Sequence, residues 1–250
     1  MSKQLERKIE ITCRWWRLDG KSIPKAKMGE LDDLAMEVIQ RQMRDGMTSG
    51  ELARMCNAER KCKADLTVIQ VEDWRRDAWL DQTGLPWTNP SPNMRSLTAA
   101  TLYPGVGLLE TAVSVGRGTE TPFEVVGAPY IEDVKLAAGM NEAQLPGVRF
   151  VPVRFTPKAS VFQDQPCGGV QVLLTDRANC AAVDVGLMLA LTLQRLYPTN
   201  FALENVDVLL QDRATLEAIR AGHPLAEIKQ AWAGDLEKFK QRREVCLLYP

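Results

Sequence analysis

The sequence predicts a mixed α/β fold of the α+β kind, with short strands, helices between them and a helical C-terminal tail. Two observations lead to this expectation. Apolar runs of β-type composition are short and scattered, so they do not form a continuous βαβ series. Segments with apolar residues at helical spacing fill the last third of the chain. With 250 residues, of which 45% are hydrophobic and 25% charged, the chain can bury a core without disulfides or metals.

The elements are predicted in order from local signals. Apolar residues at helical spacing predict a helix over about 30–44, and a capping-box pattern at Thr48 and Glu51 begins a second helix through about Cys56. Prolines and a glycine make 83–94 a loop, after which Ser96 or Thr98 caps a helix that ends before Pro104. The other predicted elements are strands at 64–71, 106–109, 123–126, 148–155 and 169–175, and helices at 131–141, 183–196, 203–210, 214–221 and about 225–247.

Charge and hydropathy exclude several classes of protein. The 31 basic and 32 acidic residues nearly cancel, although residues 1–27 hold eight of the basic and only three of the acidic ones. This basic head also carries Trp15 and Trp16 and suits contact with nucleic acid or a membrane surface; a poorly ordered head is the favoured interpretation, and no nucleic-acid partner is predicted. The longest stretch without a charged residue, 96–109, is too short to span a bilayer. Residues 1–11 lack the apolar segment of a signal peptide, so the chain as written is predicted to be cytoplasmic.

Cysteine and histidine offer little for catalysis or metal binding. The six cysteines have no zinc-site spacing, and we expect free thiols and no metal or other cofactor. His223 is the one histidine, and it lies in the Gly222-His223-Pro224 break between two predicted helices. A nucleophilic role for Cys167 is therefore disfavoured, because no histidine is near it in the sequence.

The predicted loop at 83–94 carries side chains that suit a sugar ligand. Pro90 and Pro92 fix the backbone, and Asn89, Ser91 and Asn93 alternate with them. Their amide and hydroxyl groups can bind sugar hydroxyls or an acetamido group, and Trp87 can stack on a sugar ring. A structural loop whose Asn side chains cap neighbouring backbone groups explains the same pattern equally well.

A second segment presents a carboxylate and a guanidinium. Glu110 ends an apolar run, where a carboxylate is partly removed from water, and Gly116 and Gly118 flank Arg117 in a tight turn. An arginine presented in this way can bind a carboxylate through two hydrogen bonds. An ion pair between Glu110 and Arg117 that ties the loop is an equal alternative, and both arrangements can coexist.

Many ordered motifs between about Asp45 and Tyr249 resemble the NamZ family of exo-β-N-acetylmuramidases, also called DUF1343. The motifs are Gly46-Met47-Thr48, Ala64-Asp65-Leu66-Thr67-Val68, Trp74-Arg75-Arg76, Thr83-Gly84-Leu85-Pro86-Trp87, Asn89-Pro90-Ser91-Pro92-Asn93, Leu102-Tyr103-Pro104-Gly105, Leu109-Glu110, Ser114-Val115-Gly116-Arg117-Gly118-Thr119, Pro122-Phe123-Glu124, Gly127-Ala128-Pro129, Phe155-Thr156-Pro157, Cys167-Gly168-Gly169-Val170, Thr175-Asp176-Arg177 and Arg195-Leu196-Tyr197-Pro198.

The resemblance implies a glycoside hydrolase that removes N-acetylmuramic acid from the non-reducing end of peptidoglycan fragments. It also implies a Rossmann-like N-terminal domain, a C-terminal α/β domain and a substrate cleft between them. The residues expected to bind the amino sugar are Trp87, Asn89, Ser91, Asn93, Glu110, Ser114, Arg117 and Thr119. The family's catalytic glutamate belongs to a Pro-Glu-His-Gly-type motif that this sequence does not contain, so Glu110 is the one candidate left for catalysis.

The resemblance also divides the chain. Residues 1–44 do not match the family, 45–85 correspond to the end of the N-terminal domain, and 86–250 correspond to the C-terminal domain. The N-terminal catalytic domain is thus expected to be missing, and a separately encoded N-terminal domain is an expected partner. Family members are typically exported, which implies a start further upstream. The alternative function is a non-catalytic or degenerate muropeptide-binding protein.

Overall fold

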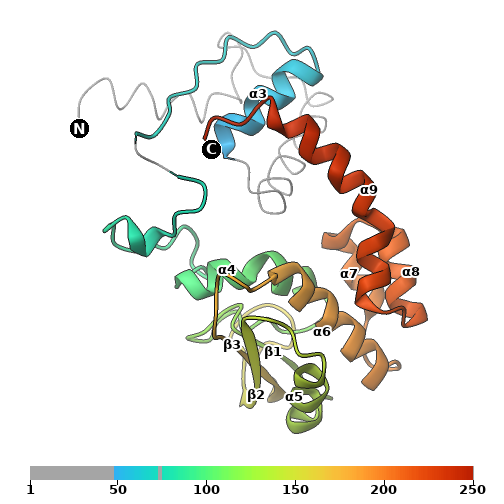
Figure 1. The fold of residues 1–250 in the computed structure, drawn as a ribbon. Coiled ribbons are helices and arrows are strands. Elements are labelled where there is room, and N and C mark those ends of the chain that lie inside the picture. Colours follow the sequence, from blue (N-terminus) through green and yellow to red (C-terminus); the bar gives the residue numbers. More distant parts are fainter. Residues whose placement is uncertain (1–47, 73–74, 250) are drawn as a thin grey trace, which may run out of the picture. The chain divides into compact units, whose positions relative to one another are not determined.

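The computed structural model describes residues 48–72 and 75–249, so the basic head and the helix predicted at 30–44 lie outside the described residues. The described chain is a mixture of helices with a small sheet, and this confirms the predicted α+β class (Figure 1). It divides into two compact units. Among the described residues, the smaller contains 48–72, 75–76 and 243–249, and the larger contains 77–242.

The smaller unit is built around α3, Ser49–Glu59, whose predicted capping box is present. The Glu51 backbone N–H donates to Thr48 Oγ1 at 3.3 Å, and the Thr48 N–H donates to Glu51 Oε2 at 2.7 Å. The other carboxylate oxygen accepts from the Leu248 N–H at 2.8 Å and from the Arg76 guanidinium. This one buried carboxylate therefore joins the start of α3, Arg76 and the C-terminal residues around Leu248. These C-terminal residues lie beside α3 (Figure 1).

The predicted strand at 64–71 is wrong, because the described residues provide no strand for it to pair with. The segment has no regular secondary structure and forms no ladder. Ile69 and Val71 are 54% and 64% exposed, and the Val71 N–H donates to the Tyr249 hydroxyl at 2.8 Å instead of to a neighbouring strand. A β-type composition indicates a strand only where a partner can complete the hydrogen bonds.

The larger unit contains an antiparallel sheet in the order β1-β3-β2. Its strands, β1 (Val125–Ala128), β2 (Val148–Phe155) and β3 (Cys167–Leu174), lie close to the predicted positions. The helix α5, Asp133–Glu142, also agrees with its prediction and buries Leu136 and Met140 in the same core as Phe150 and Val172. One face of the sheet therefore packs on α5.

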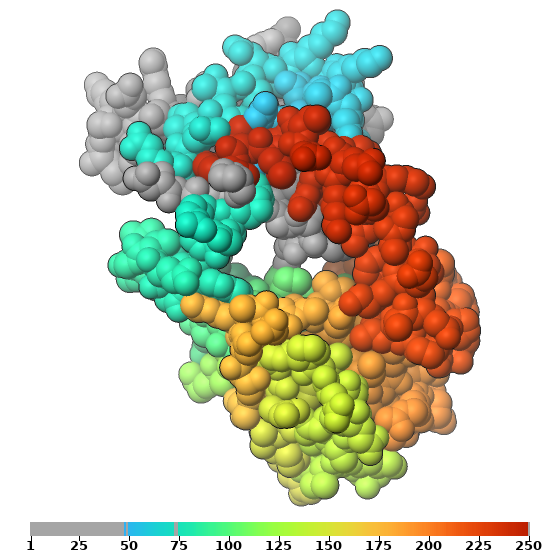
Figure 2. Space-filling model, viewed as in Figure 1, coloured from blue at the N-terminus to red at the C-terminus, as the bar shows by residue number. Residues whose placement is uncertain are grey.

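The remaining helices follow the apolar periodicity. These are α6 (Ala182–Leu196), α7 (Leu203–Leu210), α8 (Arg213–Ala221) and α9 (Leu225–Glu244). Gly222, in a left-handed conformation at φ +73°, ends α8 at the predicted break. In the space-filling view, residues of the sheet and α5 (yellow-green) and residues of α7 and α8 (orange) form neighbouring parts of the surface (Figure 2). None of the helices among the described residues combines the length and apolarity needed to cross a bilayer.

Two predictions fail at α4, Leu97–Val106. Ser96 caps this helix as expected, but the helix continues through Pro104, and the strand predicted at 106–109 is the end of α4 followed by the 3-10 turn η3, Gly107–Leu109. The reason is tertiary packing on α6. A Cβ added to Gly105 would lie 1.6 Å from the Ala182 carbonyl oxygen, and one added to Gly186 would lie 2.2 Å from the Gly105 oxygen. The two helix backbones touch, and this contact requires helical geometry beyond the proline.

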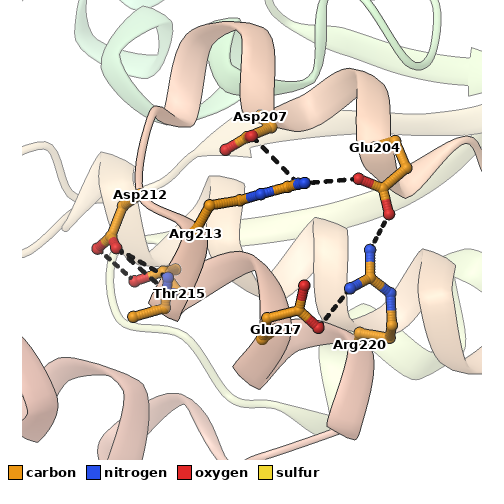
Figure 3. Close-up of polar contacts among 8 residues, drawn as sticks. Glu204, Asp207, Asp212, Arg213, Thr215, Glu217 and Arg220 are labelled. Carbon is orange, nitrogen blue, oxygen red and sulfur yellow. Dashed lines mark hydrogen bonds and ion pairs between the residues drawn. The ribbon is translucent and has the colours of Figure 1, made fainter.

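A chain of ion pairs joins α7 to α8 on the surface (Figure 3). Arg213 contacts Glu204 at 3.0 Å and Asp207 at 3.2 Å, while Arg220 pairs with both Glu204 and Glu217. Exposed pairs of this kind contribute little individually, but they favour one orientation of the two helices. The network therefore supports the helical tail without forming part of its core.

We predict that Gly105→Ala strongly destabilises the larger unit, because the new methyl group meets backbone that cannot move aside. The expected loss is about 3 kcal/mol or more of unfolding free energy. Gly234→Ala is the matched control, because Gly234 lies in α9 with nothing within 4 Å of an added Cβ. Thermal and denaturant unfolding should show a stable or slightly stabilised control. Equal melting temperatures for the two variants would contradict the backbone contact.

We also predict that Glu51 makes the stability of the smaller unit depend on pH. Burial raises the pKa of Glu51, but the hydrogen bonds from Leu248, Thr48 and Arg76 together lower it by more. The pKa therefore lies below that of an ordinary glutamate. The stabilisation is therefore complete above the ordinary pKa and is lost as the pH falls below it. Glu51→Gln should cost about 2 kcal/mol at neutral pH.

The control for Glu51 is Glu72→Gln, which changes an exposed carboxylate of the same unit. Hydrogen exchange of the α3 amides, measured from pH 7 to pH 3, checks the prediction. Wild type and the Glu72 variant should lose protection on acidification, whereas the Glu51 variant should start low and change less. Parallel pH profiles for all three proteins would refute the role of Glu51.

Candidate functional site

The glycine-flanked arginine lies in a tight turn, as its sequence suggests. Gly116 and Gly118 adopt φ values of +77° and +79°, which other residues rarely adopt. The Thr119 N–H donates to the Gly116 carbonyl at 3.0 Å, and the Thr119 hydroxyl donates to the same oxygen at 2.7 Å. The structure thus gives Thr119 a role in closing the turn that presents Arg117.

Ser114 supports this turn from beneath. Its backbone exchanges two hydrogen bonds of 2.9 Å with Gly127 of β1, and its hydroxyl accepts from the Gly116 N–H at 3.3 Å. Ser114 is only 2% exposed. This predicted site residue is therefore buried, and it connects the edge strand of the sheet to the turn.

Arg117 and Glu110, which are predicted to act together, are in direct contact. Arg117 Nη2 lies 2.5 Å from Glu110 Oε2, and the two side chains are 27% and 21% exposed. The ion pair that the sequence offered as an alternative is thus present. Within the described part of the chain, the Arg117 Nε and Nη1 groups have no hydrogen-bond partner. The pair leaves these guanidinium donors available beside a partly exposed carboxylate.

Two aromatic residues that the site prediction missed lie under this ion pair. The Phe123 ring centroid is 5.2 Å from the Arg117 guanidinium carbon, and the Tyr103 ring packs edge-to-face on Phe123 with centroids 4.6 Å apart. Tyr103 comes from α4, and Phe123 comes from the turn before β1. Both residues occur in the sequence motifs, but no sequence pattern indicates that their rings meet under Arg117.

The loop at 83–94 has no helix or strand, as predicted, and its tryptophan is held internally. The Trp87 indole N–H donates to Asn89 Oδ1 at 2.9 Å and to the Met94 carbonyl at 3.3 Å. Asn89 therefore plays the structural part that the sequence left open. Ser91 is exposed and Asn93 partly exposed, and the described residues give their side chains no hydrogen-bond partner.

This loop ends close to the segment that follows Arg117. Arg95 Nη1 lies 3.2 Å from Glu120 Oε2, and the Ser96 hydroxyl donates to Glu124 Oε1 at 2.6 Å. The two predicted parts of the site are thus joined at the beginning of α4. The structure brings Glu110 and Arg117 together and connects the Trp87 loop to them through this junction.

Cys167 and His223 lie outside this group of residues. Cys167 is 2% exposed, and burial raises the pKa of its thiol to about 11, so the nucleophilic thiolate is scarce at neutral pH. His223 lies between α8 and α9, 3.9 Å from Glu227. The described residues contain no cluster of three or more His, Cys, Asp or Glu side chains that could hold a metal ion.

Comparisons with known proteins agree with the motifs. Residues 101–249 match the sequence profile of the exo-β-N-acetylmuramidase NamZ C-terminal domain, and residues 34–98 match the profile of its N-terminal domain. The peptidoglycan β-N-acetylmuramidase NamZ of Bacillus subtilis is 38% identical over 211 residues. That alignment covers 83% of this chain and 51% of the Bacillus protein, so the chain spans about half the length of this relative.

Solved structures give the same result. The fold is similar to crystal structures of two DUF1343 family proteins from Bacteroides fragilis, with TM-scores of 0.73 and 0.59 and identities of 27% and 28%. The similarity covers 82% and 81% of this chain, and 56% and 55% of those proteins. Together with the profile that matches more than half of the sequence, these findings show that the chain belongs to the NamZ (DUF1343) family.

Proposed function

We propose that this chain recognises the terminal N-acetylmuramic acid of peptidoglycan fragments, as the C-terminal, sugar-binding part of an exo-β-N-acetylmuramidase. The observation that carries the proposal is the Arg117 guanidinium, which pairs with Glu110 through one nitrogen only. The 38% identity to a peptidoglycan β-N-acetylmuramidase supports the choice of substrate and favours it over a non-catalytic binding role. Because that enzyme acts on peptidoglycan, export of the complete protein is part of the proposal.

N-acetylmuramic acid differs from N-acetylglucosamine by a lactyl group that ends in a carboxylate. Arg117 suits this group, because its planar guanidinium can form two parallel hydrogen bonds to a carboxylate. Glu110 holds Nη2 and thereby fixes the orientation of the guanidinium. The positive φ values of Gly116 and Gly118 fix the backbone on both sides of Arg117, so little conformational entropy is lost when the ligand binds.

The rest of the sugar would be bound by the loop that ends at α4. The exposed Ser91 and the partly exposed Asn93 supply hydroxyl and amide groups, and Trp87 supplies an aromatic surface. Asn89 contributes by holding the Trp87 indole in place. Ser114 and Thr119 act on the ligand through the turn that they support.

Hydrolysis of a glycosidic bond usually needs two carboxyl groups, one acid and one base or nucleophile. Glu110 is our candidate for one of them. We propose that the second belongs to a partner, for which a separately encoded N-terminal domain is the candidate. This assignment would make the ion pair with Arg117 a part of the catalytic arrangement as well as of substrate binding.

We expect Arg117→Lys to weaken binding of N-acetylmuramic acid and Arg117→Ala to weaken it more. The loss for the alanine variant should be about 1.5–3 kcal/mol, the value of a charge-assisted hydrogen bond. The effect should be much smaller for N-acetylglucosamine, which has no lactyl carboxylate. Titration calorimetry with both sugars and thermal unfolding of each variant provide the measurement.

The competing possibility is that Arg117 only holds Glu110 in place. In that case Arg117→Ala would lower the melting temperature and leave the preference between the two sugars unchanged. Equal losses for the two sugars would likewise exclude recognition of the lactyl group.

We expect the 250-residue chain alone to release little or no chromophore from a chromogenic N-acetylmuramide. The physical reason is that the described part of the site supplies a single candidate carboxyl group, Glu110. A fluorescence or absorbance assay with wild type and Glu110→Gln decides the matter. Clear turnover that Glu110→Gln abolishes would show that this chain contains a complete catalytic site.

A further inference from the structure

The Tyr103 ring is held in one orientation by two contacts. Gly107 lies one helical turn after Tyr103, and a Cβ added to Gly107 would come within 3.1 Å of Tyr103 Cε2 and 3.2 Å of Cδ2. A side chain on Gly107 would therefore press on the ring. The Phe123 ring makes the second contact, at an interplanar angle of 74°. Tyr103 is therefore packed as tightly as a core residue although it is only partly buried.

Phe123 adopts a conformation that its own backbone disfavours. Its φ is +65°, in the left-handed region, which is a genuine outlier for a bulky residue. Such a conformation is unfavourable and persists only where the surroundings impose it. Here the Phe123 N–H donates to the Val115 carbonyl at 2.7 Å, and the buried ring contacts both Tyr103 and Arg117. The strained residue thus connects the tyrosine to the arginine.

The Tyr103 hydroxyl is the part of this arrangement that the fold does not use. Among the described residues it has no hydrogen-bond partner, and it is not one of the polar groups sealed from solvent. The Tyr103 ring packs on Phe123, whose own ring faces the Arg117 guanidinium that pairs with Glu110. Burial, followed by the Glu110 charge, raises the pKa of Tyr103, so the hydroxyl keeps its proton and can donate.

A carboxylate that binds Arg117 enters beside a second carboxylate, Glu110. Arg117 alone would then have to balance two negative charges, since Glu110 already takes one of its nitrogens. A neutral hydroxyl donor next to the pair stabilises the incoming anion without adding charge. The Tyr103 hydroxyl has the right chemistry, a fixed ring and a free donor.

We propose that Tyr103 is a specificity-determining residue, whose hydroxyl donates a hydrogen bond to the lactyl carboxylate held by Arg117. The inference rests on the proposed function and assigns a second residue to the recognition of the acidic group. It also gives a role to the unfavourable conformation of Phe123, because the Phe123 ring contacts both the Tyr103 ring and the Arg117 guanidinium.

The test is Tyr103→Phe, which removes one oxygen and retains the ring contacts with Gly107 and Phe123. Ligand-observed NMR or calorimetry on the full chain should give roughly tenfold weaker binding of N-acetylmuramic acid. Binding of N-acetylglucosamine and the melting temperature should stay unchanged. The matched control is Tyr130→Phe, which removes a buried hydroxyl without a hydrogen-bond partner. The control should bind both sugars as wild type does.

Arg117→Ala, measured in parallel, separates the two proposals. One outcome is that wild type prefers N-acetylmuramic acid, that Arg117→Ala abolishes this preference and that Tyr103→Phe leaves it intact. In that case the role proposed for Tyr103 is wrong and the proposed function stands. If Tyr103→Phe weakens both sugars equally and lowers the melting temperature, Tyr103 is structural and the inference is also wrong. If wild type shows no preference between the sugars, the proposed function fails and the inference fails with it.

Discussion

The ion pair between Arg117 and Glu110 is the interaction on which the candidate site depends. It joins the end of η3 to the glycine turn, and the Phe123 ring lies against its guanidinium. Neighbouring residues hold its surroundings in place: Thr119 closes the turn, Ser114 fixes the turn to the sheet edge, and Tyr103 packs on Phe123. A partly exposed ion pair contributes little to stability by itself. Its fixed position therefore agrees better with the ligand-binding role that we propose than with a purely structural one.

The fold supplies the rigidity that such a site requires. The backbones of α4 and α6 touch at Gly105 and Gly186, which fixes the helix that carries Tyr103. The sheet provides the other wall, because β1 bonds to Ser114 on one side and to β3 on the other. Side chains of the site thus come from α4, from the residue after η3 and from the turns before β1, which pack on one core. In the smaller unit, the buried Glu51 holds the C-terminal residues against α3 by accepting a hydrogen bond from the Leu248 N–H.

Much of this could be predicted from the sequence, and the failures have physical causes. Strand β2 and helix α7 appear at the predicted residues, because alternation and helical periodicity are strong there. The apolar run at 106–109 is too short to distinguish a strand from a helix end, and the packing of Gly105 decides for the helix. For the site, the sequence offered an ion pair between Glu110 and Arg117 as one of two alternatives, and this pair is present. The positions of Tyr103 and Phe123 depend on a left-handed backbone and a long-range ring contact, which no local pattern encodes.

A crystal structure of the chain with N-acetylmuramic acid would show whether Arg117 binds the lactyl carboxylate, as we propose. We predict that the lactyl oxygens lie within about 3 Å of the Arg117 Nε and Nη1 groups, with Glu110 still on Nη2. A sugar bound with its lactyl group facing solvent, or bound away from the turn at 116–119, would contradict this proposal.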